Sequence, residues 1–279
     1  MRVVVSPHLD DAILSLGGSI AAWTAAGERV VIVTIYTTGP TLARLAPSMR
    51  KFADYATRRR EDATAAAVVG AEVCYLDQVE RAFRRPYLTD WSFFTTPPGR
   101  DGFATLANVT RALAGVLRAP EYVYVPFGIG NHVDHVEALV AATDVAHAGS
   151  WLDRVRFYED FYALSGRIRR GHPIAKSRLW RGWQAPLLHA RRLALVLQTI
   201  AAARGGPDVL GYLAPPLRDA RWVVERSPMA AYEARKLDAI SCYASQTRAF
   251  GGRAGITRAL HAYHVWWGGA EPLWRPNLR

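Results

Sequence analysis

The first half of the chain alternates short runs of β-branched residues with segments of helical pattern, and this alternation restricts the fold more than any other feature. A run at 3–6 is followed by a helical pattern over about 11–26 and by a second β-branched run at 29–36. Two strands joined by a helix in this way lie parallel in one sheet. The sequence therefore predicts an α/β fold with a Rossmann-like, mainly parallel sheet and helices on both faces.

The same alternation continues to about residue 160. We expect, in chain order, a helix at 51–69, a strand at 72–76, a helix at 103–117, a strand at 122–125, a helix at 136–147 and a strand at 155–158. Residues 77–102 contain three prolines and Gly99, which predicts a long surface loop between two of these elements.

The pattern changes after residue 160, and it returns to a helix only at about 230–243. We therefore expect a single domain over 1–279. Its core comprises about 1–160 and 226–279, and an insertion or cap occupies about 161–225. A chain of 279 residues is long enough for one large α/β domain of this kind.

Positive charge is concentrated in the C-terminal half of the chain. The formal net charge is +11, and residues 161–207 hold nine Arg and Lys residues and no acid. One interpretation is a solvated, arginine-rich cap. The other is a surface that contacts an anionic membrane or an anionic group of the substrate.

Cysteine usage and hydropathy indicate where the protein works. Cys74 and Cys242 lie in separate apolar stretches, which favours reduced thiols over a disulfide or a cysteine metal site. No run approaches the roughly 18 to 20 apolar residues of a membrane span, and the N-terminus lacks the pattern of a secretory signal. We expect a cytoplasmic protein.

Two clusters of polar residues follow predicted strands. His8-Leu9-Asp10-Asp11 comes directly after the first strand, and His132-Val133-Asp134-His135 follows the strand at 122–125. The carboxyl ends of parallel strands meet at one edge of a sheet, which is where open α/β folds bind ligands. Together the clusters offer the set of two histidines and one aspartate that zinc accepts.

Other interpretations of these residues are possible. An aspartate in a first helical turn is favoured whatever the function, and Asn131 with Asp134 resembles a capping arrangement. His8, Asp10 and His135 also fit the facial triad of a non-haem iron oxygenase, although such sites do not normally lie on a strand-to-helix turn. A metal-free binding module for an anionic partner is a third possibility, which leaves the paired motifs unexplained.

The two motifs resemble those of the PIG-L/LmbE-like zinc N-deacetylases, which remove acetyl groups from N-acetylglucosaminyl compounds. The match rests on Ser6-Pro7-His8-Leu9-Asp10-Asp11 and His132-Val133-Asp134-His135, and it covers about the first 160 residues. It extends to the helix at 58–70 and to Tyr158-Glu159-Asp160, and more weakly to 236–246.

The resemblance implies a ligand set and a general base. His8, Asp11 and His135 would bind one zinc ion, and Asp10 would be the general base. This chemistry is sound, because zinc lowers the pKa of bound water to about 7 and a free carboxylate beside it accepts the proton during attack.

The resemblance also implies that His132 stabilises the developing charge and that Asp134 orients His132. Arg58 is the best candidate for a substrate contact, although Arg58-Arg59-Arg60 is also typical of a solvated helix face. Gly130 stands where some family members have a tyrosine, so another side chain would have to supply that hydroxyl.

The expected substrate is an N-acetylated amino sugar within a larger glycoside or secondary metabolite, with 77–102 and 161–225 as walls around the site. We expect no nucleic-acid partner, because a deacetylase site gives nucleic-acid binding no purpose. The sequence does not determine the oligomeric state. The remaining histidines are expected to be structural or exposed, and they are His147, His172, His189, His261 and His264.

Overall fold

A single mixed sheet forms the centre of the protein. The computed structural model describes residues 1–45, 50, 53–84, 96–118, 120–177, 208–247 and 252–278. Within these ranges the sheet has seven strands in the order β3-β2-β1-β4-β5-β7-β6. The strands are β1 Arg2–His8, β2 Val30–Thr38, β3 Glu72–Val79, β4 Tyr122–Pro126, β5 Val155–Tyr158, β6 Arg221–Pro228 and β7 Ala270–Asn277.

The sheet is parallel from β3 to β5. β1 pairs in parallel with β2 and with β4, and the pairs β2–β3 and β4–β5 are also parallel. Only β7 is antiparallel, to β5 on one side and β6 on the other. The predicted Rossmann-like, mainly parallel sheet is therefore confirmed. The strand order reverses between β1 and β4, which is the point where such folds bind ligands.

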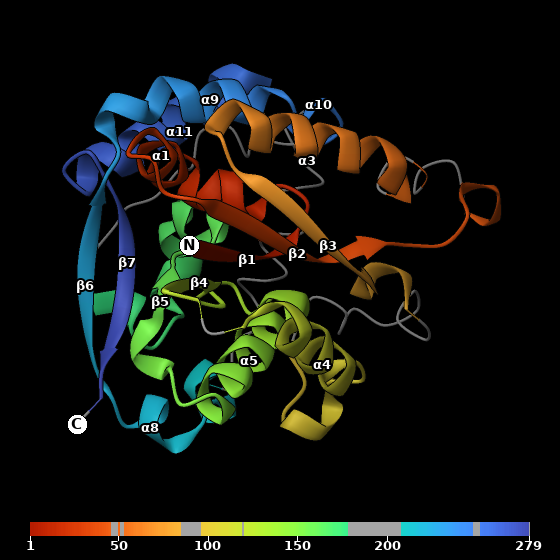
Figure 1. Cartoon of the computed structure of the whole chain (residues 1–279), viewed down its shortest axis with the longest axis vertical. Coiled ribbons are helices and arrows are strands. Elements are labelled where there is room, and N and C mark those ends of the chain that lie inside the picture. The colour runs from red at the N-terminus through yellow and green to blue at the C-terminus, as the bar shows by residue number, and fades with distance from the viewer. Residues whose placement is uncertain are drawn as a thin grey trace.

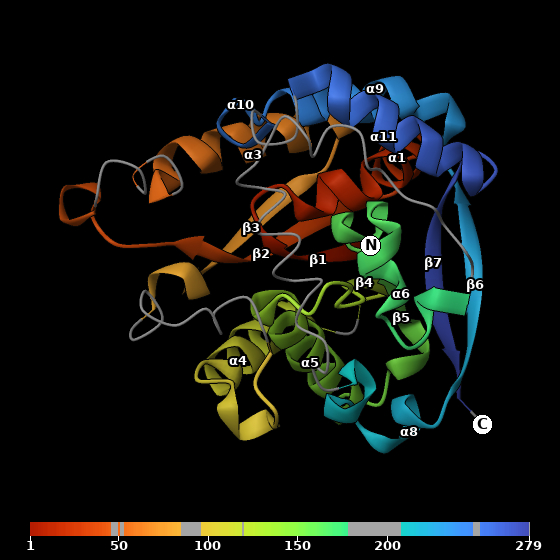
Figure 2. The same cartoon turned by 180° about the vertical axis from the view of Figure 1, so that it is seen from behind.

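Helices cover both faces of the sheet, as predicted (Figures 1 and 2). One face carries α1 Asp11–Ala25, α3 Tyr55–Val69, α9 Glu233–Ser241, α10 Ala244–Thr247 and α11 Gly252–Trp266. The other face carries α4 Leu106–Val116 and α5 Val133–Ala148, with the short α8 Pro215–Arg218 below them. A further short helix, α6 Gly166–Arg170, follows β5.

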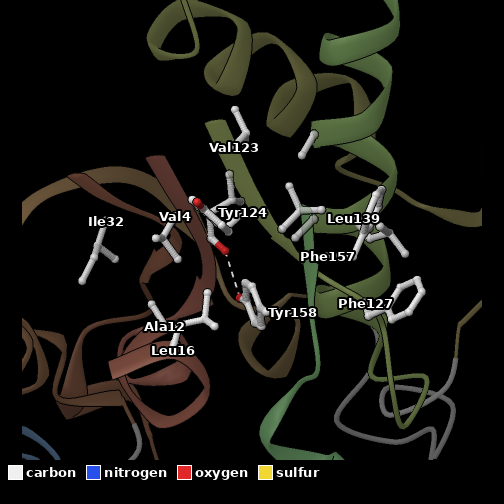
Figure 3. Close-up of a cluster of buried hydrophobic side chains, with 14 of the residues drawn as sticks. Val4, Ala12, Leu16, Ile32, Val123, Tyr124, Phe127, Leu139, Phe157 and Tyr158 are labelled. Carbon is white, nitrogen blue, oxygen red and sulfur yellow. Dashed lines mark hydrogen bonds between the residues drawn. The ribbon is translucent and has the colours of Figure 1, made fainter. Parts of the chain in front are cut away.

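The core lies between these layers. Val4, Ile32, Val123 and Phe157 come from neighbouring parallel strands and are fully or almost fully buried (Figure 3). Helix residues pack on them from both sides, as expected for a parallel sheet covered on both faces. The hydroxyl of Tyr158 lies in this core, where it donates to the carbonyl of Val5 at 2.9 Å.

The chain after residue 220 adds two strands that the sequence pattern did not predict. β6 begins at Arg221, within the range expected for the insertion, and the aromatic tail forms β7. Pro272 and Pro276 argue against a strand in the sequence. β5 pairs only with Leu273 and Trp274, so neither proline lies opposite β5, and both lie opposite residues of β6.

Two glycines of helix α1 lie directly against side chains from the C-terminal part of the chain. A Cβ atom on Gly17 would lie 2.9 Å from Lys236 Cγ, and one on Gly18 would lie 2.4 Å from Met229 Cε. Neither position has room for a side chain. The pair therefore serves close packing between α1 and the C-terminal part of the chain.

The described part of the basic segment differs from the expectation of a wholly exposed positive surface. Residues 178–207 lie outside the described residues, but 161–177 are described. Arg169 is only 1% exposed, and its guanidinium pairs with Glu159 at 2.6 Å, so the prediction of a surface charge is wrong at this position. Arg170 and Lys176 are exposed. Within the described ranges, no helix has the length and apolar character needed to span a membrane.

Candidate active site

The two histidine motifs meet where the strand order reverses. β1 ends at His8 and α1 begins at Asp11, whereas β4 ends at Pro126 and α5 begins at Val133. Because β1 and β4 are adjacent and parallel, their carboxyl ends lie side by side. The sequence prediction that both motifs share one edge of the sheet is borne out by this arrangement.

Three side chains converge on one point at this edge. Oδ2 of Asp11 lies 3.1 Å from Nδ1 of His8 and 3.2 Å from Nε2 of His135. All three residues are buried, and their candidate ligand atoms lie within 4.8 Å of one another. The carboxylate in this cluster is that of Asp11 and not that of Asp10, which does not match the triad of the iron-oxygenase alternative.

The surroundings of His135 fit a metal ligand. Nδ1 of His135 lies 2.6 Å from Oδ1 of Asp160, so the carboxylate fixes the ring and leaves Nε2 for a metal. Nε2 is buried and makes no hydrogen bond within the described part of the chain. Burial opposes protonation of this ring, but Asp11 and Asp160 raise the pKa of His135 to about 9. These two carboxylates thus favour a positive charge beside them, and either a protonated His135 or a bound divalent metal ion would provide that charge.

A second set of possible ligands, His8, His132 and Asp134, overlaps the first at His8. Both carboxylate oxygens of Asp134 already accept hydrogen bonds. Oδ2 of Asp134 accepts from the backbone N–H of Arg81 at 2.9 Å, and Oδ1 accepts from the Arg84 guanidinium. Burial opposes ionisation, but His8 and Arg84 lower the pKa of Asp134 to about 2. This carboxylate is therefore a buried anchor, and the first set is the better metal site.

Asp10 occupies a strained turn between β1 and α1. Its φ of 122° lies in the region that favours glycine, which costs about 1–3 kcal/mol in a residue with a side chain. It stands at the N-cap of α1, yet its side chain makes no capping bond. Burial and the Asp11 carboxylate raise the pKa of Asp10 well above its usual range, and Arg58 opposes the shift. The carboxyl group of Asp10 is thus next to the candidate ligand Asp11 in the chain and makes no capping hydrogen bond to α1.

Arg58 faces the site and not the solvent. It is 6% exposed, and its Nη1 donates to Oε2 of Glu80 at 3.1 Å. Of the arginine run, only Arg60 lies on the exposed face of α3, so the solvated-face interpretation does not hold for Arg58. Its charge acts on Asp10, as the opposing effect on that pKa shows.

His132 is held as a neutral ring at the start of α5. It is the N-cap residue, and its Nδ1 accepts from the backbone N–H of Asp134 at 3.2 Å. Burial and the neighbouring His135 and His8 rings lower the pKa of His132 to about 3. With Nδ1 accepting, the proton is on Nε2. The Asp134 carboxylate meets His8 at 3.1 Å, so the contact that orients His132 comes from the Asp134 backbone.

Two residues of the site were not among those predicted from the sequence. Asp160 orients His135, and the ring of Tyr162 lies 5.3 Å from that of His135 and 6.2 Å from that of His132, nearly parallel to it. Both follow β5, the next strand along the edge. The rule that located the two histidine motifs therefore applied to this third strand as well.

Tyr162 occupies the space beside Gly130. A Cβ atom on Gly130 would lie 3.2 Å from Cβ of Tyr162, so a side chain at 130 would be in tight contact with this tyrosine. Burial and the carboxylates of Asp11, Asp10 and Asp160 raise the pKa of Tyr162 well above its usual range. Its hydroxyl therefore stays protonated and is a hydrogen-bond donor.

Comparison with known families agrees with this geometry. The model of the PIG-L family, described as GlcNAc-PI de-N-acetylase, matches residues 3–146, which is more than half of the chain. The chain belongs to the PIG-L family. It is an N-deacetylase that hydrolyses the acetyl amide of an amino sugar, and the oxygenase and binding-module interpretations no longer apply.

Solved structures of deacetylases share the fold of this PIG-L member over almost its whole length. A deacetylase from the teicoplanin biosynthesis pathway has a TM-score of 0.68 and 20% identity, covering 99% of this chain and 97% of that chain. The deacetylase of the A40926 pseudoaglycone has a TM-score of 0.65 and 19% identity, covering 99% and 97%. The diacetylchitobiose deacetylase of Pyrococcus horikoshii has a TM-score of 0.50 and 16% identity, covering 99% and 83%. No curated protein sequence matches the chain.

Proposed function

We propose that this PIG-L deacetylase holds one zinc ion between His8, Asp11 and His135 and removes the acetyl group from an N-acetylglucosamine-type sugar within a larger glycoside. The observation that carries the proposal is the position of Asp11 Oδ2, 3.1 Å from one histidine nitrogen and 3.2 Å from the other. A zinc ion held by these three residues would lower the pKa of a bound water molecule and polarise the amide carbonyl.

Asp10 is the general base in this proposal. It is adjacent to the ligand Asp11, and its side chain caps no helix. It accepts a proton from the attacking water and returns it to the nitrogen of the departing amine, so the amide and water become an amine and acetate. Arg58, from α3, favours the charged form of Asp10, and in this proposal it also contacts the substrate.

His132 stabilises the charge that develops on the amide oxygen. Nδ1 accepts the capping bond, so the proton is on Nε2, and in this proposal Nε2 donates to that oxygen. The N-terminus of α5, which begins at the next residue, adds a partial positive charge. Asp134 serves His132 through its backbone N–H and fixes His8 through its carboxylate.

In this proposal, Tyr162 supplies the hydroxyl of the tyrosine that some family members have at the position of Gly130. The support is the tight contact between the two positions and the closeness of the Tyr162 ring to both site histidines. A protonated phenol here donates to the amide oxygen or to a sugar hydroxyl, and its ring offers an apolar face to the sugar.

The proposed substrate is a large glycoside. The two segments expected to form the walls of the site contact each other, because the Tyr212 hydroxyl donates to the carbonyl of Pro97. The Tyr212 ring also packs edge to face on Phe103, just after the first segment, with the ring centroids 5.2 Å apart. Similar deacetylases have been solved in complex with teicoplanin and with bog. We place the substrate of this chain in the same broad class, an amino sugar carried by a larger molecule.

The proposal has two further parts, an anionic partner for the exposed basic residues and a cytoplasmic location. Arg170 and Lys176 are exposed at the start of the basic segment, where they would attract an anionic membrane or an anionic substrate group. Cys74 and Cys242 are both free thiols, in keeping with a cytoplasmic enzyme.

The test combines metal analysis with an assay for acetate released from N-acetylglucosaminyl compounds. We expect one zinc per chain, loss of activity on chelation and recovery on adding zinc. His8→Ala and His135→Ala should lose both metal and turnover, whereas His147→Ala, on the exposed end of α5, should keep both. Full activity in a thoroughly chelated sample would overturn the proposal.

A further inference from the structure

His172 links the start of the basic segment to the end of strand β4. It lies just after α6 and is 4% exposed. Its Nδ1 accepts from the backbone N–H groups of Ile174 at 3.2 Å and Ala175 at 3.0 Å. The proton is therefore on Nε2, which donates to the carbonyl of Phe127 at 3.0 Å.

Phe127 is the first residue of the loop that leads from β4 to His132. The backbone of this loop is unusual, because φ is 73° at Gly128, 96° at Gly130 and 53° at Asn131. A non-glycine residue with positive φ is strained and persists only where the surroundings hold it. The ring of Phe127 is fixed in the buried core (Figure 3), but the rest of the loop needs other contacts.

Within the part of the chain that the structure describes, three hydrogen bonds hold the backbone of this loop from outside. The N–H of Phe127 donates to the carbonyl of Tyr158 at 3.0 Å, and the N–H of Ile129 donates to Asp160 at 2.8 Å. The bond from His172 adds a third contact from outside. Asp160 also orients His135, so the contacts that hold this loop are shared with the metal site.

We propose that His172 is a positioning residue for catalysis, which holds the loop at 127–131, and through it His132, by its hydrogen bond to the Phe127 carbonyl. The inference rests on the proposed role of His132. It also gives the start of the basic segment a function inside the enzyme, because 161–177 supply both Tyr162 beside the site and His172 behind it.

Two substitutions distinguish the hydrogen bonds that Nδ1 of His172 accepts from the one that its Nε2 donates. In His172→Asn, the side-chain oxygen still accepts from the N–H groups two and three residues ahead, but the side chain is too short to reach Phe127. In His172→Gln, the longer side chain places an N–H donor near the position of Nε2. The asparagine variant thus removes the tether and the glutamine variant keeps it.

The experiment uses the full, zinc-loaded chain and measures kcat, KM, zinc content and thermal unfolding. We expect His172→Asn to lower kcat about 10- to 100-fold, in line with the cost of a small misplacement of a catalytic group, with little change in KM or zinc. His172→Gln should stay within about threefold of the wild type. The exposed His147 provides the control variant His147→Asn.

A double substitution tests whether the effect passes through His132. In a His132→Ala background, His172→Asn should lower kcat by less than about threefold, because residues that act through one another are not additive. Additive losses, equal losses in the Asn and Gln variants, release of zinc, or unfolding of His172→Asn at the assay temperature would each overturn the proposal. Failure of the proposed deacetylation would appear instead as an inactive wild type.

Discussion

Oδ1 of Asp160 lies 2.6 Å from Nδ1 of His135, so a carboxylate from the end of β5 orients a candidate metal ligand on α5. Carboxylates in this position fix the ring and raise its basicity as a ligand. We expect Asp160→Asn to weaken zinc binding about 10- to 100-fold. A competition titration with a chelator measures the change. Asp153→Asn, at an exposed aspartate near the start of the same strand, is the control.

Asp10 and Asp11 should behave differently when each is replaced by asparagine. Asp11 lies between the two histidines, whereas Asp10 lies outside the cluster of ligand atoms. Asp10→Asn should keep zinc and lose about 10²- to 10⁴-fold in rate, the usual contribution of a general base. Asp11→Asn should lose the metal itself. Zinc analysis of both purified variants decides, and loss of metal from the Asp10 variant would reverse the assignment of the two carboxylates.

Tyr162 should contribute through both its hydroxyl and its ring. Tyr162→Phe removes one hydrogen-bond donor, which is expected to lower kcat about 10-fold, the equivalent of about 1.4 kcal/mol. Tyr162→Ala also removes the apolar face beside His132 and should raise KM in addition. Steady-state kinetics with a large glycoside substrate measures both effects. Tyr232→Phe, in the turn before α9, should have the activity of the wild type, and equal activity of Tyr162→Phe would exclude a role for its hydroxyl.

Acid should destabilise the fold through His172. Burial lowers the pKa of His172 to about 3, so its neutral form is the one that the folded protein retains. The unfolded chain takes up a proton near pH 6.5, which means that this stability is complete above that pH and declines as the pH falls. Between pH 6.5 and 5 the loss is about 2 kcal/mol.

The check on this pH dependence is a set of urea unfolding curves at pH 7, 6 and 5. His172→Gln has no group that titrates in this range at this position, so its free energy of unfolding should fall less steeply than that of the wild type. Other buried histidines contribute equally to both proteins. Identical slopes for the two proteins would show that His172 does not carry the effect.

The exposed basic residues should affect binding to anionic membranes without affecting the chemistry. In sedimentation with vesicles, we expect binding to anionic lipid at low salt, no binding to neutral lipid, and release at 1 M salt, where the Debye length is about 3 Å. The variant with Arg170→Gln and Lys176→Gln should bind more weakly and should keep its activity on a soluble substrate. Absence of binding to anionic vesicles at low salt would leave the solvated-cap interpretation.

The sequence alone was sufficient for the local features of the site. His8-Leu9-Asp10-Asp11 and His132-Val133-Asp134-His135 each follow a strand whose β-branched residues identify it, and parallel strands end at a common edge. The fold class and the two motifs are therefore encoded over short distances, in residue types and spacing.

The tertiary structure decided the contacts between distant segments. Nothing near His135 in the sequence indicates that Asp160 lies behind its ring. The three adjacent arginines at 58–60 look alike in the sequence, and only the packing of α3 shows that the first of them is buried. Likewise, the basic stretch gave no sign that Arg169 would pair with Glu159 in the core or that His172 would hold Phe127. Burial and partner choice depend on which surfaces meet in three dimensions, and residue spacing along the chain carries that information only within a single element.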